Sequence, residues 1–165
     1  MADHIANTSP FCYLHGAGIL HVMPAMLGRV IVPGQVVAEL TAGRERGHNL
    51  PDPLALPWLE VRTVEPLVPS IGFFGAVAFL GAGERAVLTL ALRNPGAVAI
   101  LDDLPARRVA ARLEVKVTGT LNLILVAKQL GHVQAVRPIL DRLQELRFRV
   151  SADLRAHILS LAGEA

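Results

Sequence analysis

The chain has 165 residues, enough for one domain with a sizeable core and too few for two well-packed ones. Apolar residues make up 52% of it, which excludes an intrinsically disordered chain. The net charge is only +2, but six Lys and Arg stand against nine Asp and Glu up to Asp103, and ten against five from Leu104 onward. An acidic pole beside a basic half suits a metal site that acts on a polyanion, although solvated helix surfaces give the same pattern.

Alternating apolar segments predict strands and helices in turn along the first half of the chain. We expect a strand at 4–7, a helix at 8–18, a strand at 28–33, a helix at 34–43, a loop at 44–57 and a strand at 58–64. Thr8 or Ser9 is expected to cap the first of these helices, ahead of Pro10. Gly43 is expected to end the second helix.

The second half continues the alternation and then becomes helical. We expect a helix at 81–94, a strand at 97–101, a helix at 105–113, a strand at 115–117, a helix at 118–131 and two amphipathic helices at 134–147 and 151–163. Such alternation predicts an α/β fold, with a mostly parallel sheet covered by helices. Residues 1–165 are expected to form a single domain on which the C-terminal helices, from about 134–163, pack.

Three features bear on the cellular setting. The most apolar window, residues 70–83, is shorter than the roughly 20 residues that a bilayer span needs, so no membrane segment is expected. The opening "MADHIANTSP" lacks the cationic and apolar regions of a signal peptide. The single cysteine, Cys12, excludes an intrachain disulfide framework and fits a reducing cytoplasm.

Polar side chains are predicted to gather at one edge of the sheet. The apolar run 97–101 ends in Asp102 and Asp103, and carboxylates at the end of a buried strand are costly unless a cation meets them. In parallel sheets, ligands bind beyond the carboxyl ends of the strands. This rule places Asn7, Asp102 with Asp103, and residues 118–120 at the same edge.

Two further acids lie on helices that start at this edge. Glu39 is mid-helix in "VVAEL", where it could be solvated, and Glu84 is in a first turn, where a carboxylate favourably meets the helix dipole. Asp102 or Asp103 could cap the following helix, but one cap needs only one acid. Several acids that converge on one edge are typical of a site for a hard cation such as Mg²⁺. The sequence therefore predicts a divalent metal site.

Five motifs, taken in order, resemble one family. They are "IANTSPF", "VIVPGQVVAEL", "LGAGERAVLTLAL", "AILDDLPARRVA" and "VTGTLNLILVAKQLG", within a resemblance from residue 5 to about 163. The set resembles the PIN-domain family, in particular bacterial and archaeal proteins related to VapC-type ribonuclease toxins. The resemblance implies a three-layer α/β/α fold with a central, mostly parallel sheet, often dimeric. It also implies an acidic pocket that binds Mg²⁺ or Mn²⁺ and hydrolyses phosphodiester bonds in RNA.

The resemblance carries over to individual residues by motif. It implies catalytic acids and metal ligands at Glu39, Glu84, Asp102 and Asp103, with Asn7 as a further metal ligand. It implies substrate contacts at Ser9, Thr118 and Thr120. On the helix that leaves the edge, Arg107 and Arg108 are candidates for steering RNA phosphates, with solvated surface as the alternative interpretation.

Asn7 departs from the family pattern, in which the first strand normally ends in an aspartate before Thr-Ser-Pro. An amide oxygen can ligate Mg²⁺, but it brings no charge and cannot act as a base. Asp3 lies roughly 13 Å away along an extended strand, at about 3.3 Å per residue, which is too far to replace it.

Two functions therefore remain open. The first is a metal-dependent ribonuclease, the toxin-like component of a toxin–antitoxin pair with a cognate antitoxin protein. The second is a catalytically weakened PIN module that binds RNA or a protein partner without cleaving it. Asn7 is the sequence feature that separates them, because it removes one charge from the predicted metal site.

The remaining motifs exclude other activities. There is no Walker lysine, no GxSxG elbow and no HxxxH or HxxH spacing, and neither glycine-rich segment completes a dinucleotide fingerprint. Cys12 is expected to be a core thiol and not a nucleophile. Phe73, Phe74 and Phe79 could stack bases, but the apolar patch 71–80 around them lacks interleaved basic residues and favours core or a homodimer interface.

Overall fold

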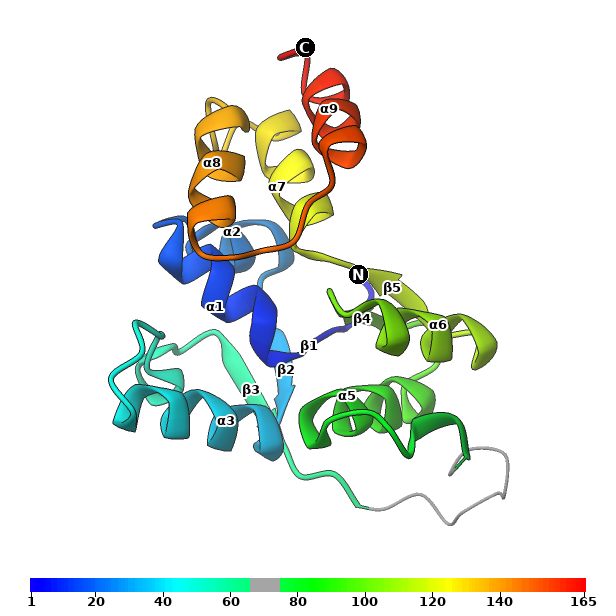
Figure 1. The fold of residues 1–165 in the computed structure, drawn as a ribbon. Helices are drawn as coiled ribbons and strands as arrows, with labels where there is room; N and C mark the ends of the chain where they lie inside the picture. Colours follow the sequence, from blue (N-terminus) through cyan, green and yellow to red (C-terminus); the bar gives the residue numbers. More distant parts are fainter. Residues whose placement is uncertain (66–74) are drawn as a thin grey trace.

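The computed structural model describes residues 1–65 and 75–165 of the chain. These residues form a five-stranded sheet in the order β3-β2-β1-β4-β5, all strands parallel, with helices on both faces (Figure 1). The prediction of a three-layer α/β/α fold with a mostly parallel sheet is confirmed. The strands are β1 (His4–Ala6), β2 (Val30–Pro33), β3 (Leu59–Arg62), β4 (Val98–Ile100) and β5 (Lys116–Thr118).

Helices join and cover the strands. They are α1 (Thr8–Gly16), α2 (Val22–Leu27), α3 (Gly34–Glu45), a short 3-10 helix η1 (Pro53–Ala55), α5 (Ala82–Arg93), α6 (Leu104–Arg112), α7 (Thr120–Gln129), α8 (Arg137–Glu145) and α9 (Ala152–Leu161). Helix α5 packs across β1, β2 and β4, while α6 packs on β5. At the other end, α8 packs against α1 and α9 against α7, so the C-terminal helices lie together above the sheet in Figure 1.

The centre of the sheet is fully buried, as expected of parallel strands covered on both faces. Ile5 in β1, Val32 in β2 and Ile100 in β4 are each 0% exposed. The predicted run that ends at Asp102 is buried through Leu101, which is also 0% exposed. Burial of the strand up to its last apolar residue therefore brings Asp102 to the edge of the core.

Helix α3 runs past its predicted end. It continues through Gly43 to Glu45, so the prediction that Gly43 ends the helix was wrong. Gly43 is buried, and a Cβ built there would lie 2.4 Å from Cδ1 of Leu50. The glycine is needed for the close approach of the loop that follows the helix and not for a turn of the backbone.

Helix α2 was not predicted. It is six residues long and carries Pro24 in its first turn, a position where proline costs little because the amide would have no helical partner. Gly28, with φ of +67°, follows its end. The helix buries Val22 and Met23 in the core. Its shortness and its proline hide the helical periodicity that a longer segment would show.

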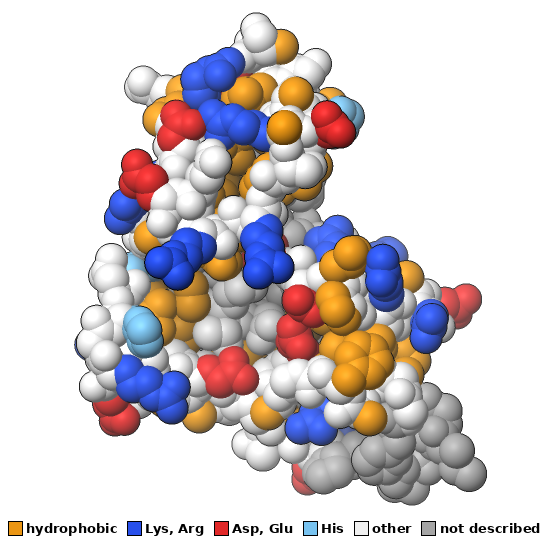
Figure 2. Space-filling view, viewed as in Figure 1, with side chains coloured by type: hydrophobic (Ala, Val, Ile, Leu, Met, Phe, Trp, Pro, Cys, Tyr) orange, Lys and Arg blue, Asp and Glu red, His pale blue; other side chains and the backbone are white. Residues whose placement is uncertain are grey.

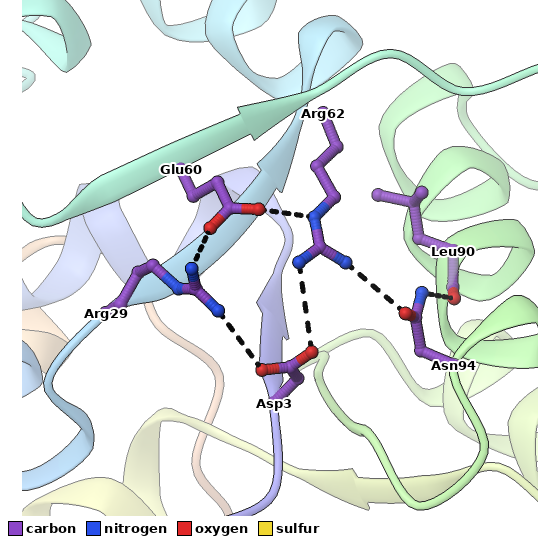
Figure 3. A network of polar contacts seen from close by, with 6 residues as sticks. All are labelled: Asp3, Arg29, Glu60, Arg62, Leu90 and Asn94. Carbon is purple, nitrogen blue, oxygen red and sulfur yellow. Dashed lines mark hydrogen bonds and ion pairs between the residues drawn. The ribbon is translucent and has the colours of Figure 1, made fainter.

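A charged network ties the amino end of the sheet together (Figure 3). Glu60 accepts from Arg29 and from Arg62, at 2.5 and 2.6 Å, and Asp3 lies 3.6 and 3.9 Å from the same two guanidinium groups. Arg62 also donates to Asn94 at the end of α5, 3.3 Å away. Asp3 is thus engaged here and is no substitute for the missing acid at position 7.

Two further predictions concern apolar segments. Within residues 1–65 and 75–165, no helix is long and apolar enough to cross a membrane. Phe73 and Phe74, named as core or interface residues, lie outside the described residues, as does part of the patch 71–80. Phe79 is described and is 66% exposed.

A single carboxylate near the C-terminus fastens the last helices together. Glu164 accepts hydrogen bonds from the backbone amides of Val136 and Arg137, at 2.6 and 2.9 Å, where α8 begins. Lys128 at the end of α7 forms an ion pair with the same carboxylate at 3.1 Å. The amides of Val136 and Arg137, helped by Lys128, lower the pKa of Glu164 from 4.5 to about 2.

Replacing Glu164 with Gln is expected to destabilise the protein at neutral pH and to flatten its response to acid. A carboxyl whose pKa is lowered in the folded state stabilises that state above its unfolded value of 4.5, and this contribution is lost as the pH falls toward about 2. Melting temperatures followed by circular dichroism from pH 7 down to pH 3 measure the effect. Glu145→Gln, at an exposed pair with Arg142, is the control. Parallel curves for wild type and Glu164→Gln would contradict the prediction.

Candidate functional site

The carboxyl ends of β1, β4 and β5 meet at one edge of the sheet and bring distant polar residues together. The amide of Asn7, directly after β1, donates to the carbonyl of Ile100 at 3.1 Å. The amide of Leu101, directly after β4, donates to the carbonyl of Thr118 at 2.9 Å. Because the backbone hydrogen bonds of the sheet continue past the ends of the strands in this way, the residues that follow the strands are held in fixed positions.

Asn7 and Glu39 form the first part of the site, across from Gly83 of α5. The Oδ1 atom of Asn7 is buried and has no hydrogen-bond partner among the residues that the structure describes, and Asn7 as a whole is 8% exposed. A Cβ built on Gly83 would lie 2.8 Å from this oxygen and 2.8 and 2.9 Å from the two carboxylate oxygens of Glu39. We call this space, bounded by Asn7, Glu39 and Gly83, the cradle.

Glu39 is held in place by neighbours from two other elements. Its Oε1 atom accepts from the amide of Gly83 at 3.1 Å, and its Oε2 atom accepts from the hydroxyl of Thr8. The prediction that Thr8 or Ser9 caps α1 was wrong: Asn7 is the N-cap, without a side-chain hydrogen bond to the helix. The hydroxyl of Thr8 binds Glu39 instead, so this helix start serves the site and not its own cap.

The cradle contains hydrogen-bond acceptors, the oxygens of Asn7 and Glu39, but lacks a donor for Oδ1 of Asn7 among the described residues. An acceptor that is buried without a partner costs free energy, and a carboxylate nearby adds to the cost. Amide and carboxylate oxygens are the ligands that hard divalent cations prefer in proteins. An orphaned oxygen beside a carboxylate, with a glycine opposite to leave room, is an arrangement that fits such a cation.

Asp102 forms the second part of the site and is held by three neutral donors. Its Oδ1 accepts from the amide of Thr120 at 2.7 Å, and its Oδ2 accepts from the hydroxyls of Thr120 at 2.6 Å and Ser9 at 3.0 Å. Within residues 1–65 and 75–165, Asp102 and Asp103 form no ion pair with Lys or Arg. The nearest cation to Asp102 that the contacts show is Arg107: a Cβ built on Gly119 would lie 2.7 Å from its Nη1 and 3.0 Å from Oδ1 of Asp102, although the two groups form no ion pair.

The two threonines of the Thr-Gly-Thr turn have different positions. Thr120 is 0% exposed, so its hydroxyl is beyond the reach of a substrate. That hydroxyl positions Asp102 through a hydrogen bond to its Oδ2. Thr118 is half-buried, lines a cavity and accepts from the side-chain amide of Asn122 at 3.0 Å. Of the two threonines predicted to contact the substrate, only Thr118 is therefore accessible.

Asp103 and Glu84 also serve their helices. Asp103 is the N-cap of α6 and accepts from the amide of Ala106 at 3.4 Å, and Glu84 accepts from the amide of Gly81 at 3.0 Å, where α5 begins. Burial raises the pKa of Glu84, and the charges of Asp103 and Glu39 raise it further, against the hydrogen bond from Gly81. Both acids thus add negative potential to the site while they bind helix ends.

The four predicted acids do not form one compact cluster. In the described part of the chain, no three His, Cys, Asp or Glu side chains lie close enough together to hold a metal ion. At the cradle, the oxygen beside the carboxylate of Glu39 is the side-chain amide oxygen of Asn7, and asparagine is not one of these four residue types. A metal bound here would depend on two protein side chains and water more than on a shell of carboxylates.

Two cavities open beside Asp102 and carry basic side chains. The smaller, about 260 Å³, is lined by Ser9, Tyr13, Asp102, Asp103, Arg147, Phe148 and Arg149. The larger, about 620 Å³, includes Arg107, Thr118, Asn122, Arg149 and His157 in its wall. Figure 2 shows a hollow at this face, with Lys and Arg side chains along the segment between α8 and α9 and acidic side chains across from them.

The arginines differ from the prediction. Arg107 lines the larger cavity, where it donates to the carbonyl of Leu101 at 2.8 Å, but Arg108 is exposed and lines neither cavity. Arg147 and Arg149 were missed, because no motif marks them. Their only signal in the sequence is the "RFR" between the two predicted C-terminal helices, in the basic half of the chain.

Cys12, near the same edge, has the character of a structural thiol. Burial raises the pKa of Cys12 to about 11, and the charge of Glu39 acts in the same direction. The thiolate is the nucleophilic form, so at neutral pH this side chain is unreactive.

Comparison with known proteins assigns the chain to a family. A family model described as a PIN domain matches residues 3–164, which is nearly the whole chain. No curated protein and no solved structure matches the chain significantly. The match covers the whole parallel sheet and both parts of the site. The chain belongs to the PIN-domain family.

Proposed function

We propose that this chain is a divalent-metal-dependent ribonuclease that acts through the edge formed by Asn7, Glu39 and Asp102. The observation that carries the proposal is the cradle, where a buried oxygen of Asn7 without a donor lies beside the Glu39 carboxylate. Family membership supports a nuclease-type fold, and PIN domains are generally dependent on divalent metals. We further propose that residues 1–165 act as a single PIN-like domain, with the C-terminal helices as part of it.

The residues present fit Mg²⁺ or Mn²⁺. Asn7 and Glu39 would hold the ion, and Asp102 would face it from the end of β4, with Glu84 and Asp103 adding negative potential around it. When bound, such a cation acts as a Lewis acid toward a phosphodiester and lowers the pKa of water.

The chain's own side chains supply orientation. Thr8 and the Gly83 amide fix the carboxylate of Glu39, while Ser9 and Thr120 fix that of Asp102, so both acids are arranged before a substrate arrives. Thr118 and Arg107 face the larger cavity, where they can contact the sugar-phosphate chain. Acidic side chains that are held in place at strand and helix ends favour phosphodiester cleavage, because the reacting groups are already oriented.

A second candidate function rests on Asn7 itself. A neutral amide gives the site one negative charge fewer than an aspartate, which weakens attraction for a divalent cation. On this alternative the chain is a PIN module that binds RNA or a protein partner without cleaving it. Metal affinity separates the two candidates before any cleavage is measured.

The biological setting is also part of the proposal. We propose a toxin-like component of a toxin–antitoxin pair, held by a cognate antitoxin protein and working in the cytoplasm, where the half-buried Cys12 would stay reduced. Phe79, 66% exposed beside other apolar residues, supports a homodimer. Light scattering at high micromolar concentration tests this last point, and a clean monomer would contradict it.

The proposal is tested by titrating Mn²⁺ into the wild type and into Glu39→Gln by calorimetry. We expect one site in the wild type, and at least a tenfold weaker affinity in Glu39→Gln, since the variant loses the only charged group of the cradle. Glu45→Gln, an exposed acid at the end of the same helix, is the matched control and should bind like the wild type. Equal affinity in wild type and Glu39→Gln would place the metal elsewhere and overturn the proposal.

A further inference from the structure

The segment between α8 and α9 faces the acidic edge with three consecutive side chains. Arg147, Phe148 and Arg149 line the smaller cavity together with Ser9, Asp102 and Asp103. Phe148 and Arg149 also line the larger cavity, as does Asp102. We call residues 147–149 the basic turn. It is the part of the described chain that joins the two cavities across from the acids.

The backbone fixes the basic turn. Arg147 has φ of +65°, the left-handed conformation that glycine usually provides after a helix, and its amide donates to Gln144 at 3.0 Å to close the end of α8. Phe148 packs edge-on against Tyr13 of α1, with ring centroids 4.6 Å apart. These contacts, from two elements, hold the arginines on the side of the molecule that carries the site.

Both arginines are exposed cations without an acidic partner. In the described part of the chain, neither Arg147 nor Arg149 forms an ion pair or a side-chain hydrogen bond. They face Asp102 and Asp103 across a cavity of about 260 Å³ and do not close onto them. The cavity between the arginines and the acids therefore has room for a ligand, and the two arginines would bind an anionic group on it.

The order of residues in the basic turn, Arg-Phe-Arg, indicates which class of ligand it would bind. Two guanidinium groups suit two phosphates, and a phenyl ring between them offers an unpaired base a face or an edge to pack on. Bases in a duplex stack on one another and are not free for such a contact, whereas single-stranded bases are. Cations that flank an aromatic ring are typical of proteins that bind single strands.

We propose that the basic turn binds the phosphodiester backbone of single-stranded RNA and holds it over Asp102. This inference rests on the proposed function for its location, because it assigns the strand a path from the smaller cavity past Asp102 into the larger one. It adds Arg147 and Arg149 as binding residues on the C-terminal helices. Substrate binding would then need the α8–α9 pair as well as the sheet.

The test is the affinity of a fluorescein-labelled single strand of about ten uridines, measured by anisotropy in EDTA so that no metal contributes. We expect Arg147→Gly/Arg149→Ala to bind about tenfold more weakly than the wild type at about 0.1 M salt. Two lost phosphate contacts should also make the slope of log affinity against log salt shallower by about 1.4. Glycine at position 147 suits the left-handed backbone, so the variant is not expected to lose its fold.

The matched control removes two charges from the opposite edge of the sheet. Arg46 follows the end of α3 and Lys116 begins β5, and both are exposed. Arg46→Ala/Lys116→Ala lowers the net charge by the same amount, so a general electrostatic effect would weaken both double variants alike. We expect the control to bind RNA within about twofold of the wild type.

Each other outcome overturns the proposal in a distinct way. Equal losses of RNA affinity in both double variants would show that net charge, and not the basic turn, causes the binding. Wild-type protein that binds no RNA would refute the proposal outright. The Mn²⁺ titration tests the metal site separately in either case. Equal affinity for a duplex would refute the preference for single strands. Tighter, arginine-dependent binding of polyglutamate would assign the basic turn to an acidic protein segment instead of RNA.

Discussion

Asn7→Asp is expected to make the metal-free protein less stable and its affinity for Mn²⁺ greater. Asn7 is 8% exposed, and its Oδ1 lies with the two oxygens of Glu39 around the same point in front of Gly83. A second carboxylate there would be buried at position 7 and would face the carboxylate of Glu39, which is itself exposed. We expect a loss of about 1–3 kcal/mol at pH 7 without metal, the usual cost of an unpaired buried polar or charged group.

The same change should strengthen metal binding by roughly 10- to 100-fold, because a charged ligand replaces a neutral one at a hard cation. Added Mn²⁺ should then raise the melting temperature of Asn7→Asp much more than that of the wild type, since a ligand stabilises the state it binds. The opposite signs of the two effects make the result specific. A generally damaging substitution would lower stability without increasing affinity.

Calorimetry with Mn²⁺ and thermal melts at pH 5 and pH 7 measure both effects. Repulsion between two carboxylates raises the pKa of one of them, so the metal-free variant should be closest to the wild type in stability at the lower pH. Gln129→Glu adds the same charge at the exposed end of α7 and is the control. If Asn7→Asp binds Mn²⁺ no better than the wild type, Asn7 does not contact the metal, and the cradle loses its assigned role.

The meeting of the candidate residues at one edge of the sheet could be predicted from local pattern. A buried run that ends in Asp102 and a first strand that ends at Asn7 are visible in the sequence, and parallel strands bring such ends to one edge. The burial of β4 through Leu101 bears out this reasoning. Prediction succeeded where the relevant property depends on neighbours in the chain.

The detailed contacts could not be predicted, because they join residues that are far apart in sequence. Thr8 and Ser9 matched a helix-cap pattern, yet their hydroxyls bind Glu39 and Asp102, 31 and 93 residues away. Local cap chemistry competes with such bonds, and the packing of α1 against α3 helps to decide between them. Arg147 and Arg149 were missed for the same reason, since their place beside Asp102 follows from how α8 packs on α1.

Gly83→Ala is expected to abolish metal binding while leaving the protein nearly as stable as the wild type. An alanine Cβ at this position would lie 2.8 Å from Oδ1 of Asn7 and 2.8–2.9 Å from both oxygens of Glu39, distances at which the side chains must move apart. Gly83 is the second residue of α5, where alanine favours the helix by roughly 0.5–1 kcal/mol. This gain offsets part of the cost of displacing Glu39, whose long side chain can move.

A methyl group in the cradle occupies the space that the cation needs, so we expect the affinity for Mn²⁺ to fall by at least 100-fold in calorimetry, with a melting temperature within a few degrees of the wild type. Gly34→Ala is the matched control: it lies in the first turn of α3, and a Cβ there meets nothing within 4 Å. The control should bind Mn²⁺ normally. Unchanged binding by Gly83→Ala would show that the metal does not lie between Asn7 and Glu39. Loss of binding together with a preserved fold would locate the ion at this glycine, because no charged or hydrogen-bonding side chain is removed.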